Sequence, residues 1–130
     1  MNGMARRVIA VLAMALLSGV TGQAMARDYQ LMVGNSPSQY VGGTYRYQLQ
    51  LDDPAEVRID SELLPAGFYD ARLRAVLRDE RGNVVAESAR RGDNFTLVRT
   101  LQPGRYVLEV HGQHLGGDDR GFFRLRTSMH

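Results

Sequence analysis

From Tyr45 onward, the chain contains several stretches in which apolar side chains recur at every second position. The clearest stretches run over residues 45–51 and 73–77, where the intervening positions hold Arg and Gln except at Val76. A period of two is the spacing at which successive side chains of a β-strand point to opposite faces. These stretches carry no helical stripe of apolar residues. The chain is therefore predicted to form half-buried strands.

Further alternating segments occur at Val57–Ile59, Phe95–Leu97, Tyr106–Val110 and Phe123–Leu125, and a short apolar run occurs at Val84–Ala86. They are separated by turn signals at Asp52–Pro54, Asp79–Asn83 and Leu101–Gly104. Short strands about every 10 to 12 residues, punctuated by Gly and Pro, are typical of sandwiches and barrels. We expect an all-β fold, a small antiparallel β-sandwich of the jelly-roll kind. Its predicted core includes the inward-phase residues Leu73, Leu77, Tyr106 and Leu108.

Two segments are less regular. Residues 27–42 are expected to form an N-terminal edge segment ahead of the sandwich domain at 43–127, with Gln30–Val33 as an edge strand. Ser61–Phe68 contains Pro65 and Gly67, and it is interpreted as an irregular crossing between sheets, with a single turn of helix as an option.

Residues 1–26 have the pattern of a cleaved signal peptide, a helix that would precede the fold. Arg6 and Arg7 form a basic start, an apolar run follows, and Ala24-Met25-Ala26 supplies the small residues of a cleavage site. We expect a bacterial protein that is periplasmic or secreted and begins at Arg27. The chain has no cysteine, so neither a disulfide nor a lipoprotein anchor is expected. Outside this segment the sequence has no run of about 20 apolar residues, so no membrane anchor is predicted.

Charge argues against one class of partner. The chain has 16 basic and 14 acidic residues, and Arg6 and Arg7 in the signal account for the whole formal excess. A balanced exported protein lacks the surplus of positive charge that general nucleic-acid binding requires. We therefore expect an envelope or extracellular protein or glycan as partner, and no nucleic acid.

The order of motifs resembles the bacterial pre-peptidase C-terminal domain, a small β-sandwich found on secreted peptidases. The matching elements are Tyr45–Leu49, Val57–Ile59, Asp70–Leu77, Asp79–Asn83, Leu101–Val110 and Phe122–Thr127. The resemblance covers roughly residues 43–127. It implies a non-catalytic accessory or binding module. Where the family often has Asp-x-Asp-Leu, this chain has Arg72 in place of the second acid.

Arginines are the first candidate binding residues. Arg72, Arg74 and Arg78 share one side of their predicted strand, and Arg124 and Arg126 share one side of theirs. If the two strands are neighbours, they form an anion-attracting strip suited to acidic glycan or phosphate groups. The alternative is a solvated sheet face on which Glu109 and other acids pair with the arginines.

A second cluster contains His111, His114, Asp118 and Asp119, in what we interpret as a loop before the last strand. Imidazoles and carboxylates are ligands of transition metals. The alternative is a polar, Gly-rich connection, because side chains at i and i+3 of an extended chain point to opposite sides and need a turn to share an ion. A metal-binding protein or metal-dependent enzyme is thus the alternative function.

Catalysis by a nucleophile has little support in the sequence. Ser61, Ser88 and Ser128 lie outside any recognisable nucleophile motif, and no cofactor fingerprint is present. The sequence therefore predicts an exported, non-catalytic β-sandwich that acts as a binding or accessory module without a cofactor, and it does not identify the ligand.

Overall fold

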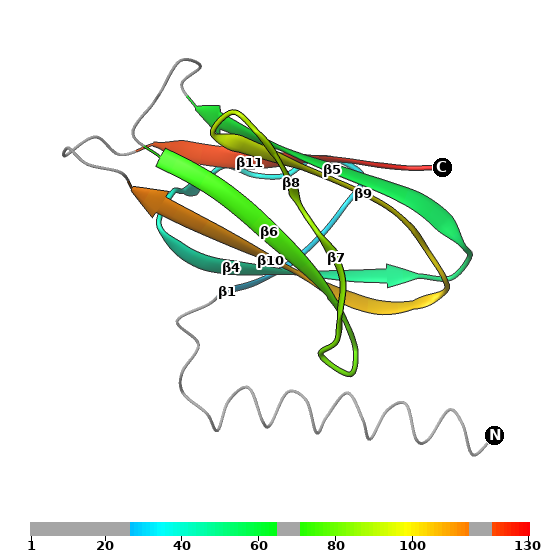
Figure 1. Ribbon diagram of the computed structural model, residues 1–130. Coiled ribbons are helices and arrows are strands. Elements are labelled where there is room, and N and C mark those ends of the chain that lie inside the picture. Colours follow the sequence, from blue (N-terminus) through cyan, green and yellow to red (C-terminus); the bar gives the residue numbers. More distant parts are fainter. Residues whose placement is uncertain (1–26, 65–70, 115–120) are drawn as a thin grey trace.

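The structure is a computed structural model, which describes residues 27–64, 71–114 and 121–130. The predicted signal peptide at 1–26 lies outside the described residues. Across the described ranges all the regular elements are β-strands, arranged as two stacked sheets (Figure 1). In the same ranges no helix has the length and apolar character needed to cross a membrane.

The first sheet, sheet A, has five strands. Their order is β1 (Arg27–Gln30), β4 (Gly43–Leu51), β10 (Gly104–His114), β6 (Ala71–Asp79) and β7 (Val84–Glu87). Neighbouring strands are antiparallel except β1, which runs parallel to β4.

The second sheet, sheet B, has the order β2 (Gly34–Asn35), β11 (Phe122–Met129), β5 (Ala55–Leu64), β9 (Asn94–Leu101) and β8 (Ala89–Arg91). A further short strand, β3 (Gln39–Tyr40), also pairs with β11. Two sheets packed face to face confirm the predicted β-sandwich.

The core lies between the two sheets and is made by the inward phase of the long strands. Leu73, Leu77, Tyr106 and Leu108 are all buried, which confirms the phase predicted for β6 and β10. The largest fully buried side chains from the rest of the core are Tyr47, Phe95, Phe123, Ile59, Leu97 and Leu125. Burial of this apolar surface is the main contribution to stability in a chain without disulfides.

Two of the predicted turns make different kinds of connection. Asp79–Asn83 closes a hairpin between β6 and β7, and the Asp79 carboxylate accepts the backbone N–H groups of Arg81 and Asn83 at 2.9 Å. The turn at Gln102–Pro103 instead carries the chain from sheet B to sheet A. There the Tyr106 hydroxyl donates to the Gln102 carbonyl at 2.7 Å, which fixes the start of β10.

The N-terminal segment differs from the prediction. The strand is Arg27–Gln30 and not Gln30–Val33, and Met32 and Val33 are 71% and 66% exposed. After β1 the chain crosses to sheet B, where β2 and β3 pair with β11, and then returns as β4. Such a crossover is what allows two strands of one sheet to run parallel.

The expected irregular crossing at Ser61–Phe68 is wrong over its first half, because β5 continues to Leu64. Ser61 is fully buried, and its hydroxyl donates to the Asn94 side chain and accepts the Phe95 N–H, both at 2.8 Å. A satisfied hydroxyl lets the strand keep its pairing through a polar inward position. Residues 65–68 lie outside the described residues.

Candidate functional site

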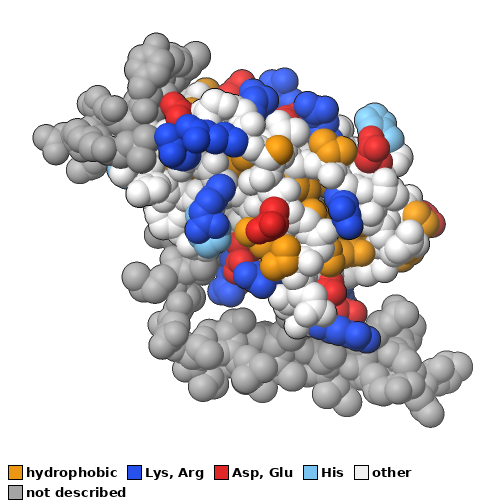
Figure 2. Space-filling view, viewed as in Figure 1, with side chains coloured by type: hydrophobic (Ala, Val, Ile, Leu, Met, Phe, Trp, Pro, Cys, Tyr) orange, Lys and Arg blue, Asp and Glu red, His pale blue; other side chains and the backbone are white. Residues whose placement is uncertain are grey.

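The outer face of sheet A carries the arginines of β6. Arg72 and Arg74 are exposed and alternate with buried neighbours, whereas Arg78 is half-buried at the other end of the strand. Figure 2 shows basic side chains, in blue, at several places on the face in view, with acidic side chains beside some of them. Which arginines have an acidic partner therefore decides where this surface is positive.

At the β6–β7 hairpin end, two arginines have acidic partners. The Nε atom of Arg78 donates to Glu109 on β10 at 2.8 Å, and Arg46 on β4 pairs with Asp28 on β1 at 3.3 Å. Arg78 also donates to the Gly82 carbonyl at 2.9 Å, so it holds the hairpin in place. The predicted alternative, pairing with Glu109, is what the structure shows for Arg78.

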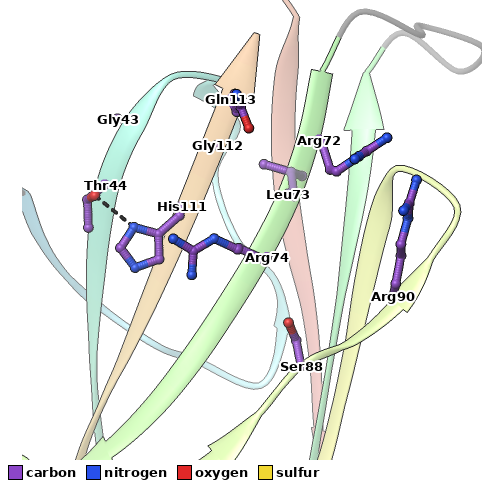
Figure 3. A pocket seen from close by; sticks show the side chains of 10 residues that line it. All are labelled: Gly43, Thr44, Arg72, Leu73, Arg74, Ser88, Arg90, His111, Gly112 and Gln113. Carbon is purple, nitrogen blue, oxygen red and sulfur yellow. Dashed lines mark hydrogen bonds between the residues drawn. The ribbon is translucent and has the colours of Figure 1, made fainter. Parts of the chain in front are cut away.

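At the opposite end of β6 the arginines have different surroundings. Arg72, Arg74 and Arg90 line a hollow of about 430 Å³ that contains no Asp or Glu among its lining residues (Figure 3). In the described ranges, no carboxylate lies within ion-pair distance of these three guanidinium groups. We call this feature the basic hollow. The remaining lining residues are Gly43, Thr44, Leu73, Ser88, His111, Gly112 and Gln113.

The basic hollow exists because the chain changes sheets beside β6. Strand β7 ends at Glu87, and the next strand, β8, belongs to sheet B. Ser88 lies between them and is held to Ala75 by two bonds of 2.9 Å, one through its N–H and one through its hydroxyl. The Leu73 N–H donates to the Asp93 carbonyl at 2.9 Å, which ties the far end of this crossing to β6. The crossing brings Arg90 to the side of Arg72 (Figure 3).

His111 lies on the β10 side of the basic hollow. It is opposite Arg74 in the β10–β6 register and opposite Thr44 in the β10–β4 register. Its Nδ1 atom is hydrogen-bonded to the Thr44 hydroxyl at 3.0 Å. Burial lowers the pKa of His111 below 6.5, and the positive charges of Arg74 and Arg78 add to this while Glu109 opposes it. A neutral imidazole is therefore favoured near neutral pH.

The predicted histidine loop is wrong for its first half, because His111 and His114 both belong to strand β10. They lie on opposite sides of the sheet. His114 bonds the Val41 carbonyl through Nε2 at 2.6 Å, whereas His111 bonds the Thr44 hydroxyl. Strand geometry thus keeps the two rings from sharing an ion. Asp118 and Asp119 lie outside the described residues, and the described residues contain no cluster of three metal-ligating side chains.

The single arginine strip over two strands is not formed. Arg72 and Arg74 belong to sheet A, whereas Arg124 and Arg126 are on β11 in sheet B. Arg124 pairs with Glu62 at 2.5 Å, and Arg126 donates to the Asn35 side chain at 3.4 Å. The sheet B arginines therefore interact with neighbours on their own face.

Arg90 and Thr44 were missed by sequence reasoning. Arg90 lies in the short strand Ala89–Arg91. All three residues are exposed, so the sequence there does not alternate between polar and apolar side chains. Thr44 lies just before the first strongly alternating stretch, and only the register of β4 against β10 places it on His111. A pattern of charges in the sequence does not report on which strands become neighbours.

The serines considered as nucleophiles serve the backbone. Ser61 is buried under its bonds to Asn94 and Phe95, and Ser88 is bonded to Ala75. Neither hydroxyl is paired with a histidine, and a serine nucleophile needs a base within hydrogen-bond reach. The described part of the chain thus offers neither of these serines an activating base.

No family model matches the chain, and no curated protein matches it in sequence. Solved structures do match in fold. The pre-peptidase C-terminal domain of collagenase from Bacillus anthracis has a TM-score of 0.61 at 19% identity, covering 78% of this chain and 94% of that one. PliG from Aeromonas hydrophila, a periplasmic inhibitor of g-type lysozyme, has a TM-score of 0.56 at 12% identity, covering 81% and 97%. The predicted resemblance to pre-peptidase C-terminal domains is confirmed at the level of fold.

Proposed function

We propose that this chain is an exported, non-catalytic binding module whose anionic partner docks at the basic hollow. The observation that carries the proposal is the contrast along β6. Arg78 has a carboxylate partner, whereas Arg72, Arg74 and Arg90 line a hollow that contains no described acid. A partner that brings acidic groups supplies the missing counter-charges.

The neighbours in fold support the kind of activity. One is a domain of a collagenase, and the other is a periplasmic inhibitor of a lysozyme. The inhibitor is a protein of this shape whose described role is to act on another protein. The signal-like residues 1–26 support export to the periplasm or the medium. An envelope or extracellular protein or glycan is the partner class that fits both observations.

The chemistry of the basic hollow suits binding more than catalysis. Guanidinium groups present planar forks of N–H donors that match carboxylate and phosphate oxygens, and they stay charged at any physiological pH. An exposed charge pair contributes up to about 1 kcal/mol, so several are needed for useful affinity. Binding through such pairs weakens as salt increases.

The test compares two matched charge reversals in the purified protein. One variant carries Arg72→Glu and Arg74→Glu on sheet A, and the other carries Arg124→Glu and Arg126→Glu on sheet B. Both change the net charge by the same amount. Each is used to capture partners from envelope and culture fractions at low and at moderate salt, with circular dichroism to confirm that the fold is kept.

We expect the sheet A variant to lose the partner held by the wild type and the sheet B variant to keep it. Raising the salt should weaken the wild-type complex because exposed charges are screened. A partner retained by the sheet A variant and lost by the sheet B variant would move the binding surface to the other sheet. Turnover by the purified wild type that a His111→Ala variant lacks would replace the proposal with an enzyme.

A further inference from the structure

The three arginines and His111 of the basic hollow form two separate pairs. Figure 3 shows the Arg74 guanidinium beside the imidazole of His111, on the β10 side of β6. Arg72 turns the other way, toward Arg90 on the short strand β8. One compact anion therefore meets one pair and leaves the other without a counter-charge.

The spacing of the two pairs follows from the strand. Arg72 and Arg74 are two residues apart on one face of β6, so their Cα atoms are about 7 Å apart along the strand. An extended peptide repeats side chains on one face with the same spacing of about 7 Å. Two Glu side chains separated by one residue on such a peptide therefore start from the same spacing as Arg72 and Arg74, and they splay apart to reach the two divergent guanidinium groups.

The neutral lining fits a polypeptide. A volume of about 430 Å³ is far larger than one carboxylate requires, and Thr44, Ser88 and Gln113 add polar groups around it. Peptide amides both donate and accept hydrogen bonds, so these groups can pair with a backbone. Among the described lining residues there is no Trp, Tyr or Phe, the side chains on which sugar rings most often stack, and His111 is the one aromatic ring. An acidic peptide is thus favoured over an acidic glycan.

We infer that the basic hollow binds an extended acidic segment of a partner protein, in which two carboxylates are separated by one residue. One carboxylate pairs with Arg72 and Arg90, and the other pairs with Arg74 beside His111. The inference rests on the proposed function, because it assigns a partner class to the same surface. It adds a requirement that the proposed function does not contain, namely the spacing of the two carboxylates along the partner's segment.

The probes are short synthetic peptides of equal length in a neutral Ser and Thr background, titrated calorimetrically into the purified protein. The first holds two Glu residues separated by one Thr, the second holds the two Glu residues side by side, and the third replaces both with Gln. Oligogalacturonate is titrated as an acidic glycan. The protein is used as wild type, as Arg72→Gln, as Arg74→Gln and as Arg99→Gln, a matched change at an exposed position on β9 in sheet B.

We expect the spaced peptide to bind about fivefold more tightly than the adjacent one, because it forms one additional exposed charge pair and such a pair changes the affinity by about that factor. Arg72→Gln and Arg74→Gln should each weaken the spaced peptide by about fivefold and abolish the preference for spacing. Arg99→Gln should change neither. The Gln peptide should show no binding.

Equal affinity for the spaced and adjacent peptides would overturn the inference, as would binding that neither β6 variant weakens. Binding of oligogalacturonate with no binding of the spaced peptide, lost in the same two variants, would also overturn it and would assign the hollow to a glycan. The proposed function would survive that result. If neither probe binds and the β6 variants keep the natural partner, both proposals fail.

Discussion

Arg74 lies directly opposite His111 in the register between β6 and β10, so a permanent cation faces a titratable ring inside one hollow. On the same two strands, Arg78 and Glu109 form a direct ion pair. The outer face of sheet A is therefore divided into an end where Arg46 and Arg78 have acidic partners and a positive end, where no described acid lines the hollow around Arg72 and Arg74. The positive end depends on pH through His111.

This arrangement predicts a loss of stability on mild acidification. Burial and Arg74 lower the pKa of His111 below 6.5, so the unfolded chain binds this proton more readily than the folded one. The free energy of unfolding should fall as the pH decreases through the range just below 6.5, and His111→Gln should remove that part of the fall. Urea unfolding at about pH 7.5 and about pH 5.5 measures it.

Titration of Asp60 does not contribute to the difference between these two pH values. Burial alone would raise its pKa, but hydrogen bonds from Thr96 and Arg58 and the charges of Arg58 and Arg91 outweigh burial and hold the pKa below 3.8. Its contribution is lost only at more acidic pH. Wild type and His111→Gln that lose the same stability between the two conditions would contradict the account of His111.

The strand phase of the core is tested by Leu108→Ala. Leu108 is fully buried between the sheets, so this change should reduce the free energy of unfolding by about 2 to 5 kcal/mol. Arg74→Ala on the exposed face of β6 is the control and should cost less than about 1 kcal/mol. Similar small losses at both positions in urea titrations would show that the inward and outward faces are wrongly assigned.

The close packing at the end of β10 is tested by Gly112→Ala. A Cβ atom there would lie 3.0 Å from the Gly42 nitrogen, 3.1 Å from Val41 Cγ1 and 3.2 Å from Leu73 Cδ2. We expect destabilisation of about 1 to 3 kcal/mol from this overpacking. Gln113→Ala at the next, exposed position is the control. An unchanged melting temperature for Gly112→Ala would mean that this end of the sandwich opens easily.

Export is tested by the mass of the protein recovered from the periplasm or the medium. If Ala24-Met25-Ala26 is cleaved as its pattern predicts, the chain begins at Arg27. Full-length protein found only inside the cell would remove the support that export gives to the proposed function.

Much of the fold was predictable because a two-residue period fixes which side chains face inward. The alternation of Leu73, Ala75 and Leu77 appears in β6 as predicted, and the Asp79–Asn83 turn closes a hairpin. Asp79 provides the local reason, since its carboxylate satisfies two backbone N–H groups of that turn. Such information is local and can be read from a few neighbouring residues.

The candidate site was only partly predictable because it depends on contacts distant in the sequence. Arg72 and Arg74 could be placed on one face, but nothing in their neighbourhood showed that Arg124 would lie in the other sheet. His111 was expected in a loop because of its Gly and polar neighbours, yet pairing with both β4 and β6 extends β10 to His114. Tertiary pairing overrides local propensity there.

The central claim is that the outer face of sheet A, at the basic hollow, is the binding surface. It is tested most directly by following backbone amide NMR signals while the spaced acidic peptide is added to the purified protein. The account predicts that the shifts concentrate on Arg72, Arg74, Arg90 and His111, and that β11 in sheet B stays unchanged. Shifts centred on Arg124 and Arg126, with the hollow unaffected at saturating peptide, would contradict it.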